Sequence, residues 1–221
     1  MGKDRVFSHA YNPERAALKY MRRTLLVAAL LFLSACVHFS PEDRPLLSAG
    51  EHMRLAAIYE SKGENEAALT QYRYAALADE TNPEPYFAMG NINLAEKRYK
   101  AAEALYKKAI KVNPDDARFY NNLAWLYMET GRLAEARGAA VEALKKAGGA
   151  KAAYLDTLGV IEEKEKDFPG AERRFKEALS FVDREDHEGM RRIYRHMLEL
   201  YRNSGESDKA ARVERALQSG F

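Results

Sequence analysis

The sequence predicts an all-α protein in which one helix–turn–helix unit is stacked about five times into a solenoid. Five alanines, at successive spacings of 34, 34, 35 and 39 residues, have the same helical pattern around them: Ala68, Ala102, Ala136, Ala171 and Ala210. A period near 34 residues is typical of helical repeats. No stretch alternates apolar and polar residues with period two for long enough to predict a sheet.

We expect one elongated domain over residues 49–221, because a single unit cannot bury its apolar face without its neighbours. Three glycines at equivalent places, Gly63, Gly131 and Gly205, mark turns that favour a left-handed backbone. Small residues in the first helix should let it approach the second helix closely, and these are Ala56, Gly90, Ala124 and Gly159. The expected units are 49–82, 83–116, 117–150, 152–185 and 191–221.

Two helix starts are marked by capping patterns. Ser48 and Glu51 have the spacing of a capping box, in which each residue bonds the backbone of the other. Asn82 before Pro83 fits an N-cap followed by proline at the first helical position.

The last unit departs from the pattern. Leu198 stands where the small residue belongs, and Glu214 replaces an aromatic residue. A terminal repeat needs a polar outer face, so we interpret 191–221 as a capping repeat. The stretch from Asp183 to Gly189 is expected to be a longer connection before it.

The pattern of each unit resembles the tetratricopeptide repeat family over roughly 170 residues. The second unit shows it most fully, with Tyr86, Met89, Gly90, Ala102, Tyr106 and Pro114 at the places that the family pattern W-x2-L-G-x2-Y, A-x3-F and P requires. The resemblance implies a right-handed superhelical solenoid. It also implies that the first helices line a concave groove that binds a protein or peptide partner.

The resemblance places eight side chains in the central part of this groove: Phe87, Asn91, Leu94, Asn121, Trp125, Met128, Asp156 and Val160. Trp125 is the only tryptophan of the chain, and aromatic residues are frequent at binding hot spots. The alternative is that Trp125 and Phe87 only pack between neighbouring units.

Some members of the family bind an acidic C-terminal tail with two asparagines and several basic residues. Asn91 and Asn122 stand at the asparagine positions, but Phe87, Ala153 and Thr157 occupy basic ones. We therefore expect no preference for acidic tails, and a bond from the Asn122 side chain to the backbone.

The N-terminal region predicts export. Residues 24–35 form a short apolar run after Arg22 and Arg23, as in a signal peptide, so 1–35 are expected to be removed. The run is too short to span a membrane. Leu33-Ser34-Ala35-Cys36 resembles a bacterial lipobox, which implies lipidation (palmitate) of Cys36. A lone buried cysteine and an ordinary signal peptide cut nearby are the alternatives for Cys36, and a start at Met21 is the alternative to a chain that includes residues 1–20.

Residues 36–48 contain Pro41 and Pro45 and read as a tether behind the lipidated cysteine. Val37 is not the aspartate that retains many lipoproteins in the inner membrane, which favours the outer membrane, facing the periplasm. Residues 1–35 hold six basic and two acidic residues, so a chain beginning at Cys36 has a formal net charge of −2 instead of +2. A near-neutral exported domain is a poor candidate for binding nucleic acid.

No catalytic or cofactor-binding pattern occurs. The five histidines form no H-E-x-x-H, no second cysteine could build a zinc site, and Walker A, G-x-S-x-G and G-x-G-x-x-G sequences are absent. We therefore expect no metal, no cofactor, no small-molecule substrate and no enzyme activity.

These observations predict a lipid-anchored scaffold of the cell envelope that binds proteins. The array with a lipobox resembles pilotin-type lipoproteins, which implies assistance in assembling a type IV pilus or its secretin. The alternative is an adaptor that recruits substrates to a periplasmic protease or peptidoglycan enzyme. An enzyme with an unrecognised site is a third hypothesis, from a different class.

Overall fold

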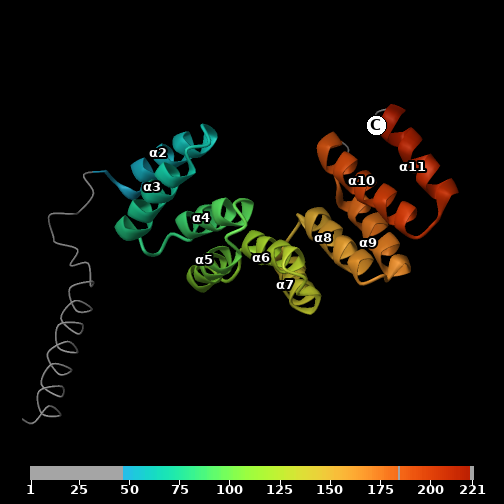
Figure 1. Ribbon diagram of the computed structural model, residues 1–221, viewed down its shortest axis with the longest axis horizontal. Coiled ribbons are helices and arrows are strands. Elements are labelled where there is room, and N and C mark those ends of the chain that lie inside the picture. The colour runs from blue at the N-terminus through green and yellow to red at the C-terminus, as the bar shows by residue number, and fades with distance from the viewer. Residues whose placement is uncertain (1–46, 184, 220–221) are drawn as a thin grey trace, which may run out of the picture. The chain divides into compact units, whose positions relative to one another are not determined.

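The computed structural model describes residues 47–183 and 185–219, and within these ranges the regular structure is ten helices without a strand (Figure 1). The all-α solenoid that the sequence predicts is therefore confirmed. The expected signal peptide, Cys36 and most of the tether lie outside the described residues. The helices are α2 (Ala49–Ser61), α3 (Asn65–Ala78), α4 (Glu84–Ala95), α5 (Tyr99–Val112), α6 (Ala117–Glu129), α7 (Leu133–Lys146), α8 (Lys151–Lys164), α9 (Phe168–Phe181), α10 (His187–Asn203) and α11 (Ser207–Ser219).

The helices pack in pairs that follow one another along the chain. The most extensive contacts join α2 with α3, α4 with α5, α6 with α7, α8 with α9, and α10 with α11. Each second helix also contacts the first helix of the next pair, and α4, α6, α8 and α10 contact one another in succession. The first helices therefore share one face of the array, which is where a groove would be expected.

The two helices of a pair approach closely because the first helix carries a small residue at the crossing point. A Cβ atom placed on Gly90 would lie 2.5 Å from the Tyr106 ring, and one on Gly159 would lie 2.5 Å from the Phe175 ring. Both rings are fully buried. These glycines are therefore required by the aromatic side chain that fills the space above them.

The turns within the pairs use a left-handed residue at a constant position. Gly63, Gly131 and Gly205 have φ angles of 74°, 73° and 79°, as the sequence predicts. Lys97 and Lys166 adopt the same conformation, with φ angles of 60° and 67°, in the second and fourth units. A lysine pays a steric penalty there that a glycine avoids, so the fold imposes this turn even where the residue disfavours it.

Both expected helix starts are observed. The Ser48 hydroxyl accepts a hydrogen bond from the Glu51 N–H, and the Glu51 carboxylate accepts one from the Ser48 N–H at 2.7 Å, which completes the capping box. The Asn82 side chain accepts a hydrogen bond from the Glu84 N–H at 3.0 Å, in front of α4.

The connection before the last pair differs from the expectation. Helix α10 begins at His187, so its first residues occupy part of the predicted connection from Asp183 to Gly189. The cause is a cap: the Asp186 carboxylate accepts a hydrogen bond from the Gly189 N–H at 2.8 Å. A Cβ on Gly189 would collide with that carboxylate, at 2.2 Å. Helix α10 therefore has 17 residues, and its Arg192 and His196 side chains bond Asp156 of α8.

A polar pair repeats at three of the four seams between successive units. One partner is the residue directly after the repeated alanine in the second helix of a unit. The other partner lies in the first helix of the next unit, three residues after its small residue. The Tyr127 hydroxyl donates to Glu103 at 3.1 Å, and the Tyr201 hydroxyl donates to Glu172 at 2.9 Å. At the seam between them the charge is reversed, because Arg137 donates to Glu162 at 3.2 Å.

Glu103 is the centre of one of the ion-pair networks at these seams. Its carboxylate accepts hydrogen bonds from Arg132 at 2.7 Å and Lys107 at 2.6 Å besides the Tyr127 hydroxyl. These donors, Arg132 first, lower the pKa of Glu103 to about 2. The ionised carboxylate therefore links α5 to α6 and to the start of α7.

We expect Gly159→Ala to destabilise the fold by about 1–3 kcal/mol, because the new methyl group overlaps the Phe175 ring and overpacking has that cost. Thermal and chemical unfolding measure the change. Gly138→Ala is the matched control, since Gly138 lies in a helix with no atom near its missing Cβ. The control should gain up to about 1 kcal/mol from helix propensity alone. Equal stabilisation of both variants would contradict the close contact.

We expect Glu103→Gln to lower the free energy of unfolding at pH 7 by about 1 kcal/mol, the size of a half-exposed ion pair. The folded pKa of Glu103 is depressed, so its contribution is complete above the unfolded value and is lost as the pH falls toward about 2. The difference from the unsubstituted protein should therefore shrink between pH 5 and pH 3 in urea unfolding experiments. Glu64→Gln, at an exposed position, should show no such trend.

Candidate protein-binding groove

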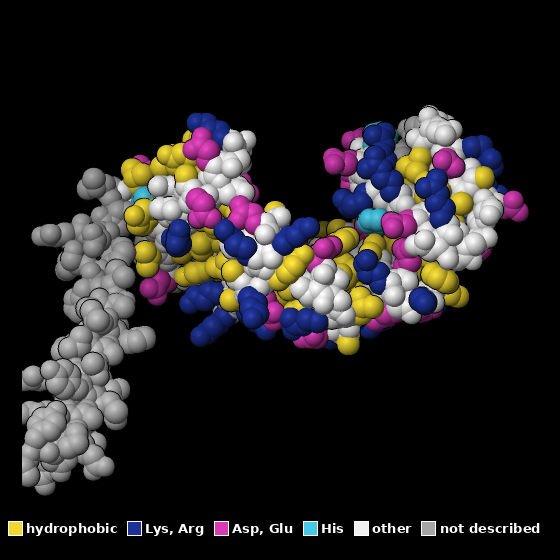
Figure 2. Space-filling view, in the orientation of Figure 1, with side chains coloured by type: hydrophobic (Ala, Val, Ile, Leu, Met, Phe, Trp, Pro, Cys, Tyr) yellow, Lys and Arg dark blue, Asp and Glu magenta, His cyan; other side chains and the backbone are white. Residues whose placement is uncertain are grey.

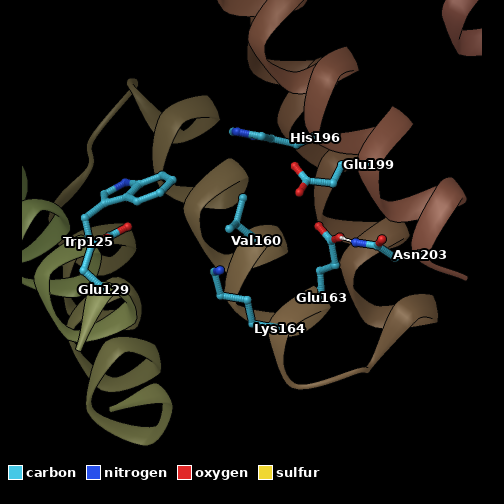
Figure 3. A pocket seen from close by; sticks show the side chains of 8 residues that line it. All are labelled: Trp125, Glu129, Val160, Glu163, Lys164, His196, Glu199 and Asn203. Atoms are coloured by element: carbon cyan, nitrogen blue, oxygen red, sulfur yellow. Dashed lines mark hydrogen bonds between the residues drawn. The ribbon is translucent and has the colours of Figure 1, made fainter. Parts of the chain in front are cut away.

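The groove-side face of the first helices contains two cavities that share one wall. The first has a volume of about 260 Å³ and lies between α6, α8 and α10 (Figure 3). The second has a volume of about 370 Å³ and lies on the side of α4 and the start of α5. Trp125 and Glu129 of α6 line both cavities. The indole is partly buried and packs against the main core cluster, so it separates the two cavities from a fixed position.

The two cavities differ in the chemistry of their walls. Besides Trp125 and Glu129, the second cavity is bounded by Leu94, Ala95, Lys97, Tyr99 and Asn122. The first is bounded by Val160, Glu163, Lys164, His196, Glu199 and Asn203. One side of the indole thus faces a mainly apolar space, and the other faces a space rimmed by carboxylates.

Of the eight expected groove residues, three line these cavities: Leu94, Trp125 and Val160. They come from α4, α6 and α8, so the structure brings together one residue from each central first helix. The remaining five have other surroundings.

Met128 and Asp156, which we expected to face the groove, are buried instead. Met128 is part of the main core cluster and is 6% exposed. Asp156 is 2% exposed, and its carboxylate accepts hydrogen bonds from His196 Nδ1 at 2.8 Å and Arg192 Nε at 3.3 Å. Asp156 is covered because Arg192 and His196 of α10 bond it, a long-range contact that the repeat pattern does not predict.

Phe87, Asn91 and Asn121 form the support of the groove floor. The Phe87 ring packs 5.0 Å from the Phe119 ring. Asn91 Oδ1 accepts hydrogen bonds from the Tyr106 hydroxyl at 2.9 Å and from Asn122 Nδ2 at 2.8 Å. The Asn122 side chain therefore bonds a side chain, and the expected bond to the backbone is wrong.

Asn121 carries a buried oxygen, Oδ1, that has no hydrogen-bond partner among the described residues. Tyr106 lies at the centre of the same floor, and burial raises its pKa to about 12. Burial therefore favours the neutral Tyr106 hydroxyl, and its bond to Asn91 holds it in place.

The acidic rim of the first cavity comes from three helices. Glu129 ends α6, Glu163 lies in the last turn of α8, and Glu199 lies on α10 (Figure 3). Asn203 Nδ2 donates to Glu163 Oε1 at 2.7 Å. Burial, with a further contribution from Glu199, raises the pKa of Glu163. Burial therefore disfavours the ionised form of Glu163.

Helix α10 also carries a basic surface near its N-terminal end. Lys and Arg side chains gather over α10 in the space-filling view (Figure 2). Arg191, Arg192 and Arg195 line a hollow of about 470 Å³ together with His187 and Glu188. Along α10 the groove-side charge thus changes from positive to negative.

Helix α10, which the sequence predicts only as part of a capping repeat, supplies His196, Glu199 and Asn203 to the first cavity. The spacing of these three residues, three and four apart, places them on one helix face. This spacing is the pattern that could have identified α10 as part of the groove in addition to its capping role.

The Asp-x-x-Gly sequence that starts α10 also occurs at Asp167 to Gly170 before α9, with the same hydrogen bond.

Two further observations concern the described part of the chain. No three His, Cys, Asp or Glu side chains in it are grouped so that they could hold a metal ion. None of its helices is both long enough and apolar enough to cross a membrane.

Comparison with known proteins agrees with the repeat pattern. The sequence profile of the tetratricopeptide repeat matches residues 93–158. Among curated proteins, the CTR9 homolog of Arabidopsis thaliana is 26% identical over 179 residues, covering 60% of this chain and 16% of that protein. U-box domain-containing protein 70 of Oryza sativa subsp. japonica is 32% identical over 125 residues, covering 55% and 15%. The chain thus spans about a sixth of the length of these relatives.

Solved structures give longer matches. PilF of Pseudomonas aeruginosa superposes with a TM-score of 0.61 at 19% identity, covering 90% of this chain and 86% of that one. The chain has the tetratricopeptide-repeat fold. PilW, described as a widely conserved type IV pilus biogenesis factor, has a TM-score of 0.68 at 20% identity, covering 77% and 76%. YrrB, described as a repeat protein with an unusual peptide-binding site, has a TM-score of 0.54 at 17% identity, covering 73% and 80%.

Proposed function

We propose that the protein is a non-enzymatic scaffold that binds a peptide segment of a partner protein in the groove centred on Trp125. The observation that carries the proposal is the position of this indole, which is partly buried and separates two cavities on the shared face of the first helices. Large, rigid aromatic side chains in such positions are frequent binding hot spots. Tetratricopeptide-repeat proteins generally act as interaction scaffolds, which agrees with this function.

The size of the cavities favours a peptide over a metabolite. Volumes of about 260 and 370 Å³ lie at or below the lower end of the roughly 300–1,000 Å³ that is usual for small-molecule sites. Each cavity suits a single side chain. Two neighbouring side chains of an extended or helical segment could then occupy the two faces of Trp125, which is a common mode of peptide recognition.

The proposed location is the bacterial cell envelope, with Cys36 lipidated and the array held at the outer membrane. The sequence around Cys36 supports this, and the cysteine lies outside the described residues. The similarity to PilF and PilW supports assistance in the assembly of a type IV pilus or secretin as the leading specific role. An adaptor for a periplasmic protease or peptidoglycan enzyme is the second candidate.

We expect Trp125→Ala to weaken partner binding about thirtyfold or more, because truncating a hot-spot aromatic residue costs roughly 2 kcal/mol or more. The partner is identified by mass spectrometry after co-purification from detergent-solubilised membranes, and its affinity for both proteins is then measured. Phe181→Ala is the matched control, since this aromatic side chain is exposed and lines neither groove cavity. A secretin as partner supports the pilus role, whereas a protease or hydrolase supports the adaptor.

The same variant tests whether Trp125 is only structural. Truncating a tryptophan of the core would lower the free energy of unfolding by roughly 3–5 kcal/mol. If Trp125→Ala loses that much stability and the purified partner still binds with unchanged affinity, the groove proposal is wrong.

We expect Cys36→Ser to move the protein from the membrane fraction to the soluble fraction, or to leave it unprocessed. Stable anchoring requires more than one acyl chain, and the lipoprotein pathway attaches several through this cysteine. Fractionation and the mass of the mature N-terminus measure the outcome. Unchanged membrane retention of a cleanly cleaved variant would rule out the anchor.

A further inference from the structure

We propose that the cavity between α6, α8 and α10 binds the guanidinium group of an arginine side chain presented by the partner. This inference rests on the proposed peptide-binding function and names the chemistry that one of its two cavities selects. The cavity combines an aromatic wall, Trp125, with three carboxylates from three different helices, Glu129, Glu163 and Glu199 (Figure 3).

The carboxylates of this rim lack basic partners. Glu129 and Glu199 make no hydrogen bond or ion pair with the part of the chain that the structure describes, and Glu163 bonds only the neutral Asn203. The buried carboxylates near the seams differ, because Glu103, Glu162 and Glu172 each pair with arginine or lysine. The array therefore pairs its structural carboxylates with cations, whereas the cavity carboxylates make no ion pair with a described residue, and the only nearby charges that act to lower the pKa of Glu163 are those of His196 and Lys164.

The helix ends increase the negative potential at this cavity. Glu129 is the last residue of α6, and Glu163 is next to the last residue of α8. A helix C-terminus carries roughly half a negative charge, so carboxylates there are unfavourable. The raised pKa of Glu163 agrees with this, because it also means that the ionised carboxylate is disfavoured. A bound cation would offset this repulsion, which supplies binding energy that a neutral side chain cannot.

The cation is better matched by arginine than by a metal ion or lysine. The described carboxylates and His196 are not grouped closely enough to hold a metal ion. A guanidinium is planar, stacks on an indole, and has five N–H donors for carboxylates at several positions. A lysine ammonium has three donors and is more strongly hydrated, so it should bind more weakly.

The chain already contains the same combination of groups in one of its seams. The guanidinium of Arg132 lies 4.2 Å from the centre of the Tyr127 ring and donates to Glu103 at 2.7 Å. The cavity presents an aromatic ring and carboxylates without the arginine. The seam thus shows that this fold accommodates an arginine between a ring and a carboxylate.

Other charged groups around the cavity restrict where the arginine can enter. Lys164 lies on the rim from α8 and makes no ion pair with a described residue. His196 is held by Asp156 through Nδ1. The arginines of the hollow on α10, Arg191, Arg192 and Arg195, repel a second guanidinium, so the acidic cavity is the favourable place along α10.

The test uses the full chain in detergent and the fluorescence of Trp125, its only tryptophan. N-acetylarginine amide, N-acetyllysine amide and N-acetylnorleucine amide are titrated separately at constant ionic strength. We expect arginine amide to change the emission with saturation in the millimolar range, and roughly tenfold weaker binding of norleucine amide, with lysine amide in between. Glu163→Gln combined with Glu199→Gln should remove the preference for arginine.

Matched controls separate the inference from the proposed function. Glu64→Gln removes an exposed carboxylate far from the cavity in sequence and should leave all three affinities unchanged. Circular dichroism confirms that each variant is folded. Equal binding of arginine and norleucine amides, no saturable response to arginine amide up to about 50 mM, or an unchanged preference in the double variant would each overturn the arginine site. If Trp125→Ala nevertheless abolishes partner binding, the groove proposal stands without it.

Discussion

The close pairing of helices in the second and fourth units depends on one steric constraint, the absence of a side chain on the first helix where an aromatic ring of the second helix crosses it. A Cβ atom would lie 2.5 Å from the Tyr106 ring if it were on Gly90, and 2.5 Å from the Phe175 ring if it were on Gly159. This contact sets how closely the helices of a pair lie, and so fixes which residues of the first helices point toward the groove. In the third unit, which carries Trp125, Ala124 and Ala140 stand at the equivalent positions, and both are fully buried.

Residues whose role is local were predictable from the sequence. The turn glycines, the Ser48 capping box and the small residues each act within one unit, so their spacing alone identifies them. The environment of Asp156 could not be predicted in this way, because it depends on α10, which lies 30 residues further along the chain. The acidic cavity was missed for the same reason: Glu129, Glu163 and Glu199 are brought together only by stacking.

The distribution of charge separates stability from recognition within one array. At the seams, carboxylates are ionised and bonded to cations, as the low pKa of Glu103 and of Glu172, both about 2, indicates. In the groove, Glu163 has a raised pKa and makes no ion pair with a described residue. Selection for stability alone would favour carboxylates paired with cations at every position. The unpaired carboxylates around Trp125 are therefore better explained by a role in binding.

The reversed pair at one seam makes the order of the units matter. Loss of the third unit, a common event in the evolution of repeat genes, would bring Glu103 opposite Glu162, so that two carboxylates would share a poorly solvated site. Loss of the second unit would only place Leu69 opposite Tyr127. The array therefore tolerates shortening at some junctions and resists it at others, and the third unit, which carries Trp125, is the one that the chain can least easily lose.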